Sequence, residues 1–396
     1  MASEPLTISV GPEGADIVGS DNRAIQAAVD YVAALGGGVV RLLPGLYTMR
    51  DSLHLRSRVR VLGGGHDTVL CKAQASVSPL GKICAYGEYE VTVVKPDGFE
   101  PGCGISLKDD RHDYFDALVA TIIGREGPIL RLSRMVHAED YEMARGAVAA
   151  TTYPVISGYH VHSAIVENLA VDGNAAHNPH LDGCRGAGIY LYGASQCTIR
   201  RCLARNYHGD GISFQNSRDI LVEDSECSGN THLGIHPGGG SQRPVVRNCW
   251  AYANGQAGLF LCWRVRHGRF ENNRLADNGQ SGISIGHQDT DNLFLGNLVA
   301  KNGQHGIHFR DETEQLSGHR NTFEDCEIVD NPVGVFIDGV TDGTTFRRCF
   351  IGSRGLGAVQ RVGVRIGPKA GLVSLEELEL LGNETDVEDM RRDCAK

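Results

Sequence analysis

The chain has 396 residues, of which 51 are glycine, and it is long and turn-rich enough for one extended domain with a continuous core. It carries 38 Lys+Arg against 48 Asp+Glu, and this net charge of −10 argues against a nucleic-acid partner. No apolar run reaches 18 residues, so we expect no membrane span.

The N-terminus and the cysteines bear on where the protein works. Residues 1–6 lack the basic and apolar character of a signal sequence, so we expect either a cytoplasmic protein or a secreted one whose signal peptide is missing here. The 12 cysteines are scattered and form no Cys-x-x-Cys pair. We therefore expect free buried thiols rather than disulfides or a zinc site.

Residues 1–76 are predicted to form a capping helix followed by the first coils of a solenoid. Asp21 can cap a helix in which apolar residues such as Ile25 and Val29 follow helical spacing, and the glycines from Gly36 end it. Such a helix would cover the open end of a stacked sheet, which needs protection from edge pairing.

Residues 77–155 do not follow the repeat of the later chain. The stretches 104–110 and 119–132 are rich in β-forming residues. We expect a small β-rich insertion that folds over one face of the molecule as the wall of a groove.

From Gly188 onward the chain repeats a short motif of glycine followed by alternating apolar residues. The motif begins at Gly188, Gly211, Gly234, Gly258, Gly282, Gly306 and Gly334. A period in the low twenties with one short strand each time predicts a solenoid that adds one coil per repeat. We expect coils over 156–370 and a C-terminal coil and tail over 371–396.

The alternation within each motif sets the faces of the strand. The first residue after the glycine, as in Ile212 and Ile283, should point into the core, and the next should point outward. Asparagines recur four residues before successive glycines and predict a hydrogen-bonded ladder: Asn230, Asn254, Asn278 and Asn302. The fold class is therefore all-β, a parallel β-helix with an N-terminal capping helix and a small β-rich insertion.

The chain resembles the pectate-lyase-like superfamily of right-handed parallel β-helices. The resemblance is carried by the coils from Gly188 and by four N-terminal runs: Ala24-Ile25-Gln26-Ala27-Ala28-Val29, Gly36-Gly37-Gly38, Leu43-Pro44-Gly45-Leu46-Tyr47 and Leu62-Gly63-Gly64-Gly65. It implies the fold. It leaves the activity open, because the superfamily holds polysaccharide lyases, polygalacturonase-like hydrolases, uronan epimerases, tailspikes and binding proteins.

The outward positions of the repeated strands carry residue types that stack on sugars and bind them. The substrate-binding candidates on or beside this stripe are Tyr190, Tyr192, Asp210, Gln215, His236, Trp263, Arg264, Arg266, His308 and Asp338. A turn is the structural alternative for Asp210, and an ordinary exposed histidine is the alternative for His236. For Trp263, a sugar platform at the groove edge is favoured over a core position.

Acid-base groups gather on the coils that begin at Gly282 and Gly306. The catalytic candidates are His287, Asp289, Asp291, Arg310, Asp311 and Glu312. Neighbouring coils lie about 4.8 Å apart, so these side chains can meet in one site. Turn capping is the structural alternative for Asp289 and Asp291, and a surface ion pair with Arg310 is the alternative for Asp311 and Glu312.

These residues predict an enzyme that cleaves glycosidic bonds of an oligo- or polysaccharide, with hydrolysis by paired carboxylates slightly ahead. A polysaccharide lyase or uronate epimerase that abstracts a proton is the first alternative, and a non-catalytic glycan-binding or tailspike-like solenoid is the second. The sequence requires no cofactor. With seven lysines and no repeated acidic run it gives no clear calcium-dependent lyase site, although Ca²⁺ and homo-oligomerisation stay open.

Overall fold

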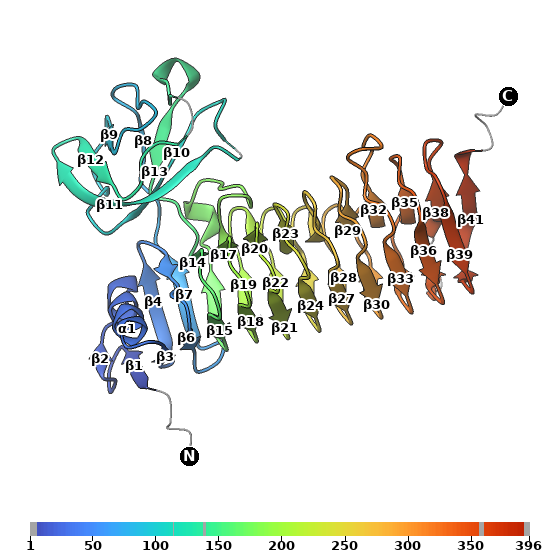
Figure 1. The fold of residues 1–396 in the computed structure, drawn as a ribbon, viewed down its shortest axis with the longest axis horizontal. Coiled ribbons are helices and arrows are strands. Elements are labelled where there is room, and N and C mark those ends of the chain that lie inside the picture. Colours follow the sequence, from blue (N-terminus) through green and yellow to red (C-terminus); the bar gives the residue numbers. More distant parts are fainter. Residues whose placement is uncertain (1–5, 114, 138–139, 356–359, 392–396) are drawn as a thin grey trace.

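The computed structural model describes residues 6–113, 115–137, 140–355 and 360–391, which wind into a parallel β-helix with three long sheets (Figure 1). One sheet runs from β2 (Ile17–Val18) at the capped end to β39 (Val373–Glu376). A second runs from β4 (Gly45–Met49) to β40 (Glu379–Leu381). All pairings within these sheets are between parallel strands, as the coil period predicts.

The third long sheet, which we call the groove sheet, contains the glycine-initiated strands. Its members are β5 (Leu53–His54), β14 (Ile156–Tyr159), β17 (Ala187–Tyr192), β20 (Asp210–Gln215), β23 (Ile235–Gly238), β26 (Ala257–Phe260), β29 (Ser281–Ile285), β32 (His305–Phe309), β35 (Val333–Ile337), β38 (Gln360–Ile366) and β41 (Asn383–Asp389). Ile212, Ile235, Leu259, Ile283 and Ile307 pair in register along it, and all are buried. The predicted fold class and core column are confirmed.

Polar ladders run inside the turns beside the core. Asn230 Nδ2 donates to Asn254 Oδ1 (2.9 Å), and the same bond repeats from Asn254 to Asn278 and from Asn278 to Asn302 (3.0 Å each). Each amide also donates to a main-chain carbonyl, such as that of Ala204 from Asn230. All cysteines in the described ranges have free thiols, as expected from their spacing.

The capping helix is α1 (Asn22–Ala34), and Asp21 caps it by accepting a hydrogen bond from Ala24 N at 3.0 Å. Its buried face, which includes Ile25 and Val29, closes the first coil. In the part of the chain that is described, no helix is long and apolar enough to cross a membrane.

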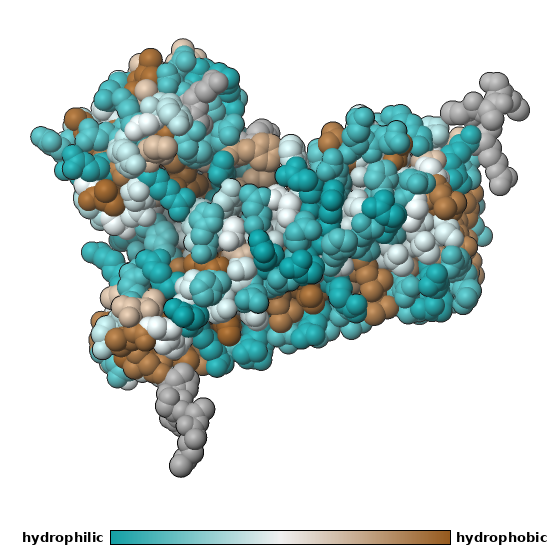
Figure 2. All heavy atoms as spheres, viewed as in Figure 1, coloured by the Kyte–Doolittle hydropathy of each residue, from teal (hydrophilic) through white to brown (hydrophobic). Residues whose placement is uncertain are grey.

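An antiparallel sheet lies within residues 77–155 and stands beside the first coils (Figure 1). Its strands, in spatial order, are β8 (Val77–Pro79), β13 (Val148–Ala150), β10 (Gly104–Lys108), β11 (Leu118–Glu126), β12 (Ile129–Leu132) and β9 (Glu90–Thr92). It has an apolar core of its own around Ile105 and Leu130. The surface is hollowed where this insertion meets the cap (Figure 2).

The outward stripe differs from expectation in the middle of the groove sheet. Ser213 and His236 should face solvent, yet both are nearly fully buried. The reason is residues 173–186, which cross over these strands, and Ser213 Oγ donates to Gly183 O at 2.6 Å. A side chain at Gly183 would collide with Asp210 and His236, so this close crossing requires glycine.

Candidate functional site

A groove between the insertion and the solenoid consists of three adjoining hollows. The cap-end hollow of about 430 Å³ is lined by α1, β11 and neighbouring loops, and the middle hollow measures about 490 Å³. They share Arg134 and Tyr159. The thiol hollow of about 310 Å³ is lined by Cys184 and Cys262 and shares Arg185 and Tyr192 with the middle hollow.

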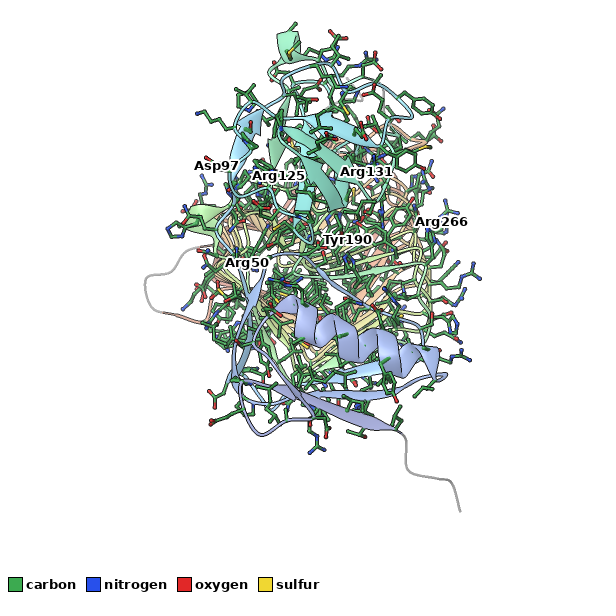
Figure 3. The ribbon with its side chains drawn as sticks, turned by 90° about the vertical axis from the view of Figure 1, so that its left-hand side faces the viewer. Arg50, Asp97, Arg125, Arg131, Tyr190 and Arg266 are labelled. Carbon is green, nitrogen blue, oxygen red and sulfur yellow. The ribbon has the colours of Figure 1, made fainter. Side chains whose placement is uncertain are left out.

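Tyr192 and Gln215 lie in the groove as predicted from their outward positions, because both line the thiol hollow. Tyr190 does not line it. Its side chain is fully buried, and its hydroxyl donates to Cys184 O, in the crossing segment 173–186, at 2.6 Å. Figure 3 shows Tyr190 inside the molecule, between the insertion above and α1 below. Gln215 Nε2 donates to Ser213 Oγ at 2.9 Å, which fixes the amide at the floor.

Asp210 and His236 form a buried pair below the groove. His236 Nδ1 lies 2.7 Å from Asp210 Oδ2, and the two side chains are 4% and 2% exposed. Burial lowers the pKa of His236, but hydrogen bonds to Asp210 and Cys262 outweigh it and raise the pKa to about 10. The imidazole is therefore charged at neutral pH, and neither a turn nor an ordinary exposed histidine describes the pair.

Trp263 stands at the edge of the thiol hollow. Its ring stacks on His287 with centroids 5.1 Å apart, and the tilted ring of Phe115 from the insertion lies 5.7 Å away. The exposed Arg264 guanidinium lies 5.7 Å from the same ring. His287 covers one face of Trp263, so the role of sugar platform stays a prediction for the part of the ring that is exposed.

The structure brings His287, Arg310 and Glu312 together beside Trp263. His287 Nδ1 lies 2.9 Å from Glu312 Oε1, and Arg310 Nε lies 3.9 Å from the same oxygen. Neither contact is aligned as a hydrogen bond, so both nitrogens are buried without such a partner. Burial lowers the pKa of His287 more than Glu312 raises it, and Arg310 lowers it further, which leaves the ring neutral at pH 7.

Asp289 belongs to the inside of the same coil. It is fully buried, and its carboxylate accepts hydrogen bonds from the main-chain N–H groups of Val265 (3.0 Å) and Gly286 (3.1 Å). Arg310 Nη2 lies 3.5 Å from it. Burial raises the pKa of Asp289 to about 7. This carboxyl group supports the turn and positions Arg310 but does not reach the groove.

Asp291 and Asp311 are not gathered into this cluster. Asp291 forms a bidentate pair with Arg320 on the exposed turn, at 2.7 and 3.0 Å, as the turn alternative suggests. Asp311 pairs with Lys369 at 2.9 Å, and both side chains are more than half exposed. Asp291 has a left-handed backbone (φ 62°) at the coil corner, and the partners of both carboxylates, Arg320 and Lys369, lie on the exposed surface outside the three hollows.

The remaining binding candidates lie off the three hollows. His308 stacks on Phe336 with centroids 5.5 Å apart, and burial lowers its pKa to about 4. Burial, with the negative charge of Asp311, raises the pKa of Asp338. Arg266 lies half-buried on a coil corner, where its main chain bridges to Gln242 and Thr290.

Sequence reasoning missed the groove residues that come from outside the repeat. Arg134 and Tyr159 face each other in the middle hollow, with the guanidinium 3.9 Å from the ring centroid. Arg185 comes from the crossing segment 173–186. Among the described residues, neither arginine is in an ion pair. Tyr159 was detectable, because it pairs in register with Tyr192, which was predicted. The two arginines carried no periodic signal.

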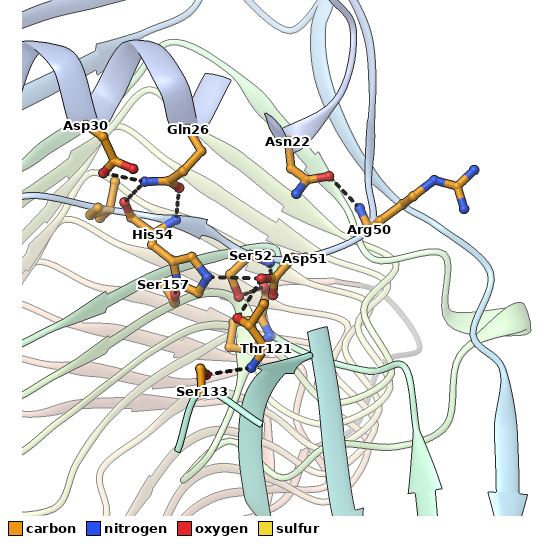
Figure 4. Close-up of polar contacts among 12 residues, drawn as sticks. Asn22, Gln26, Asp30, Arg50, Asp51, Ser52, His54, Thr121, Ser133 and Ser157 are labelled. Carbon is orange, nitrogen blue, oxygen red and sulfur yellow. Dashed lines mark hydrogen bonds and ion pairs between the residues drawn. The ribbon is translucent and has the colours of Figure 1, made fainter. Parts of the chain in front are cut away.

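A polar network at the cap-end hollow was also missed (Figure 4). Asp51 Oδ2 accepts a hydrogen bond from Thr121 Oγ1 at 2.7 Å and lies 3.2 Å from His54 Nε2. His54 Nδ1 lies 3.0 Å from Ser157 Oγ. The network ties the insertion to the first coils through Thr121 and Asp51. It supplies no free base, because both ring nitrogens of His54 have partners.

The described residues contain no group of three or more His, Cys, Asp or Glu side chains placed to hold a metal ion. The groove instead presents arginine, tyrosine, tryptophan and histidine side chains. This set can bind a negatively charged chain of rings. His287 is not among the residues that line the thiol hollow, but it stacks on Trp263 at the edge of that hollow and can move a proton there.

Comparison with known proteins agrees with this architecture. The model of the right-handed beta helix region matches residues 156–262 and 187–351. No curated protein matches the chain. Among solved structures, the A-module of mannuronan C-5 epimerase AlgE6 of Azotobacter vinelandii is similar at 17% identity and TM-score 0.57, over 93% of each chain.

Two other solved structures are similar to a comparable degree. A glycoside hydrolase has 11% identity and TM-score 0.55, over 94% of this chain and 96% of its own. PfbA, a surface adhesin of Streptococcus pneumoniae, has 12% identity and TM-score 0.56, over 92% and 88%. An epimerase, a hydrolase and an adhesin thus share the fold, so the choice among activities depends on the groove.

Proposed function

We propose that this chain, which has the right-handed parallel β-helix fold of the pectate-lyase-like superfamily, is an enzyme that acts on an anionic, uronate-containing polysaccharide. The observation that carries the proposal is the pair of arginines, Arg134 and Arg185, that line the middle hollow without an ion pair among the described residues. A protein of net charge −10 concentrates positive charge here, where an acidic sugar chain would lie.

The groove suits the sugar rings of such a substrate as well as the negative charge of its carboxylates. Tyr159, Tyr192 and Trp263 follow one another along the hollows and offer ring faces or hydroxyl groups. The field of the arginines reaches His137, whose pKa is lowered by burial and then by Arg185. A guanidinium group binds a carboxylate through two parallel hydrogen bonds, so each arginine could hold one uronate unit.

The available groups favour proton abstraction over hydrolysis. Hydrolysis needs two carboxyl groups that reach the sugar, but Asp289 is buried and both Asp291 and Asp311 are engaged in outward ion pairs. His287 is neutral, is 30% exposed, and lies against Trp263 with Glu312 beside it. It can take the proton α to a uronate carboxyl group while an arginine stabilises the developing negative charge.

Epimerisation and β-elimination begin with this same step. They differ in whether the proton returns to the sugar or the glycosidic oxygen leaves. The similarity to a mannuronan C-5 epimerase and to a glycoside hydrolase supports a carbohydrate substrate but does not rank these outcomes. We therefore place proton abstraction ahead of hydrolysis and reverse the order expected from the sequence.

The test is an assay of the purified protein in D₂O against polyuronates and neutral glucans. We expect one of two products: deuterium at the carbon α to the carboxyl group if the proton returns to the sugar, or the ultraviolet absorbance of an unsaturated product if the glycosidic oxygen leaves. His287→Gln should lower this rate about 100-fold or more, because it removes the general base. His267→Gln is the matched control, since His267 is an exposed histidine of the neighbouring coil corner outside the hollows. New reducing ends without deuterium or absorbance would overturn the proposal in favour of hydrolysis.

A further inference from the structure

Cys262 occupies the end of a buried relay at the floor of the groove. It comes two residues after the end of β26 (Ala257–Phe260) and lines the thiol hollow. Its thiol lies beside the His236 ring, and Asp210 holds Nδ1 of that ring at 2.7 Å. Asp210 is fixed in turn, because its Oδ1 accepts a hydrogen bond from Leu233 N at 3.2 Å. A thiol, an imidazole and a carboxylate therefore stand in a row that opens into a cavity.

The order of these groups is that of an activated nucleophile. A carboxylate that holds Nδ1 fixes the imidazole ring, and a thiol beside an imidazole that a third group orients is the arrangement of an enzymatic nucleophile. The relay lies away from water, since His236 and Asp210 are almost completely buried. Only Cys262 of the three groups is among the residues that line the hollow.

A second thiol in the same hollow provides a contrast. Cys184 comes from the crossing segment 173–186 and also lines the hollow. Burial raises the pKa of Cys184 strongly, and the nearby carboxylate of Asp182 raises it further. It therefore remains a protonated thiol. The two thiols of the hollow differ in their neighbour, which is the His236 imidazole for Cys262 and the Asp182 carboxylate for Cys184.

We propose that Cys262 is a nucleophile that takes the acyl group from a carboxylic ester, with His236 as its acid-base partner and Asp210 as the positioning residue. We further infer that this ester is a substituent of a glycan, which rests on the proposed function because the glycan would bind in the same groove. The chemistry of the thiol does not depend on that function.

The reaction balances without a cofactor. The thiolate sulfur attacks the ester carbonyl carbon, the C–O bond breaks, and the leaving alkoxide takes a proton from His236. Water then attacks the thioester, gives its proton to His236, and breaks the C–S bond. The products are a carboxylic acid and an alcohol, and the thiolate is regenerated.

The first test uses 4-nitrophenyl acetate and intact-protein mass spectrometry. The wild type should release nitrophenolate and carry one acetyl group that peptide mapping places on Cys262. Cys262→Ala should lose both the adduct and the ester hydrolysis. Asp210→Asn keeps an oxygen acceptor for Leu233 N, and it should slow acylation about 100-fold with an unchanged melting temperature, because the imidazole loses its orientation.

The second test separates activation from exposure. Iodoacetamide should alkylate Cys262 faster than Cys184 in the wild type, and the Asp210→Asn variant should lose that preference. Cys71→Ser is the matched control for labelling elsewhere, since Cys71 is a partly exposed thiol on β7 (Thr68–Lys72) and not a groove residue. An acetyl group found on Cys184, or equal labelling of Cys262 in the wild type and Asp210→Asn, would overturn the proposal. Neither readout uses a polysaccharide, so these tests can succeed or fail independently of the proposed function.

Discussion

Asp289 lies inside its coil rather than in the groove, although its sequence neighbours suggested a catalytic carboxylate. Two main-chain N–H groups and the guanidinium of Arg310 surround the carboxyl group. Burial nevertheless raises its pKa to about 7, because desolvation of the charged form outweighs these contacts. The group therefore links the stability of this coil to pH.

We expect the titration of Asp289 to lower the unfolding free energy of the wild type as the pH rises from 4 to 7. An unfolded aspartate loses its proton near pH 3.9, whereas the folded one keeps it up to about pH 7, so the folded state binds more protons in that window. Asp289→Asn cannot titrate. The variant should lose a pH-dependent stabilisation on the order of a few kcal/mol, measured by urea unfolding at pH 4.5 and 7.5.

Asp291→Asn is the control for Asp289→Asn. The pair with Arg320 lowers the pKa of Asp291. The ionised Asp291 therefore raises the unfolding free energy slightly as the pH rises, which is opposite to the effect of Asp289. Parallel pH curves for the wild type and Asp289→Asn would contradict the assignment of a raised pKa to Asp289.

Residue types alone could not separate these two aspartates. Both occur in His-Gln-Asp-Thr-Asp, and only the corner geometry turns Asp289 inward and Asp291 outward. The same limit applies to Tyr190 and His236, whose outward register was correct. Their burial depends on residues 173–186, which belong to no repeat.

At the scale of single elements, the asparagine ladder is the part of the fold that the sequence predicted most directly. A constant offset from the glycine places one amide per coil, and the stacking follows from the coil spacing. Asn278 Nδ2 donates to Ala251 O (3.1 Å) and to Asn302 Oδ1 (3.0 Å), while its Oδ1 accepts from Asn254. A buried ladder of this kind stabilises the turns of several coils at once.

Asn278→Ala should lower the unfolding free energy by about 2 to 4 kcal/mol, because it leaves buried donors and acceptors on three coils without partners. Thr231→Ala, on the exposed part of the turn after Asn230, should change it by less than about 0.5 kcal/mol. Equal effects in chemical unfolding would show that the ladder does not hold the coils together.

The insertion illustrates what periodicity cannot predict. Its β character was visible in the sequence, but its antiparallel pairing and its own core depend on contacts between segments such as β8 and β13 that are about 70 residues apart. Arg134 lies two residues after the end of β12, and no repeat marks it. The two arginines of the groove therefore come from segments outside the repeat, Arg134 from the insertion and Arg185 from residues 173–186.

At the scale of the whole molecule, the groove extends from α1 through the middle hollow to Trp263. The cap, the insertion, the crossing segment and the groove sheet all line it. A carbohydrate ligand that touches all three hollows must be a chain of several sugar units. Charge along that chain should matter more than any single ring, because the arginines lie in the middle.

We therefore expect Arg134→Gln and Arg185→Gln each to weaken binding of a polyuronate oligosaccharide about 10-fold or more, since each removes a charge-assisted contact. Isothermal titration at two salt concentrations should show that binding by the wild type weakens with salt and that each variant depends on salt less steeply. Arg243→Gln, which removes an arginine paired with Asp219 at 2.8 Å outside the groove, should leave the affinity unchanged. A neutral oligosaccharide of equal length that binds as tightly as the polyuronate would contradict an anionic substrate and leave the tyrosines and Trp263 as the basis of recognition.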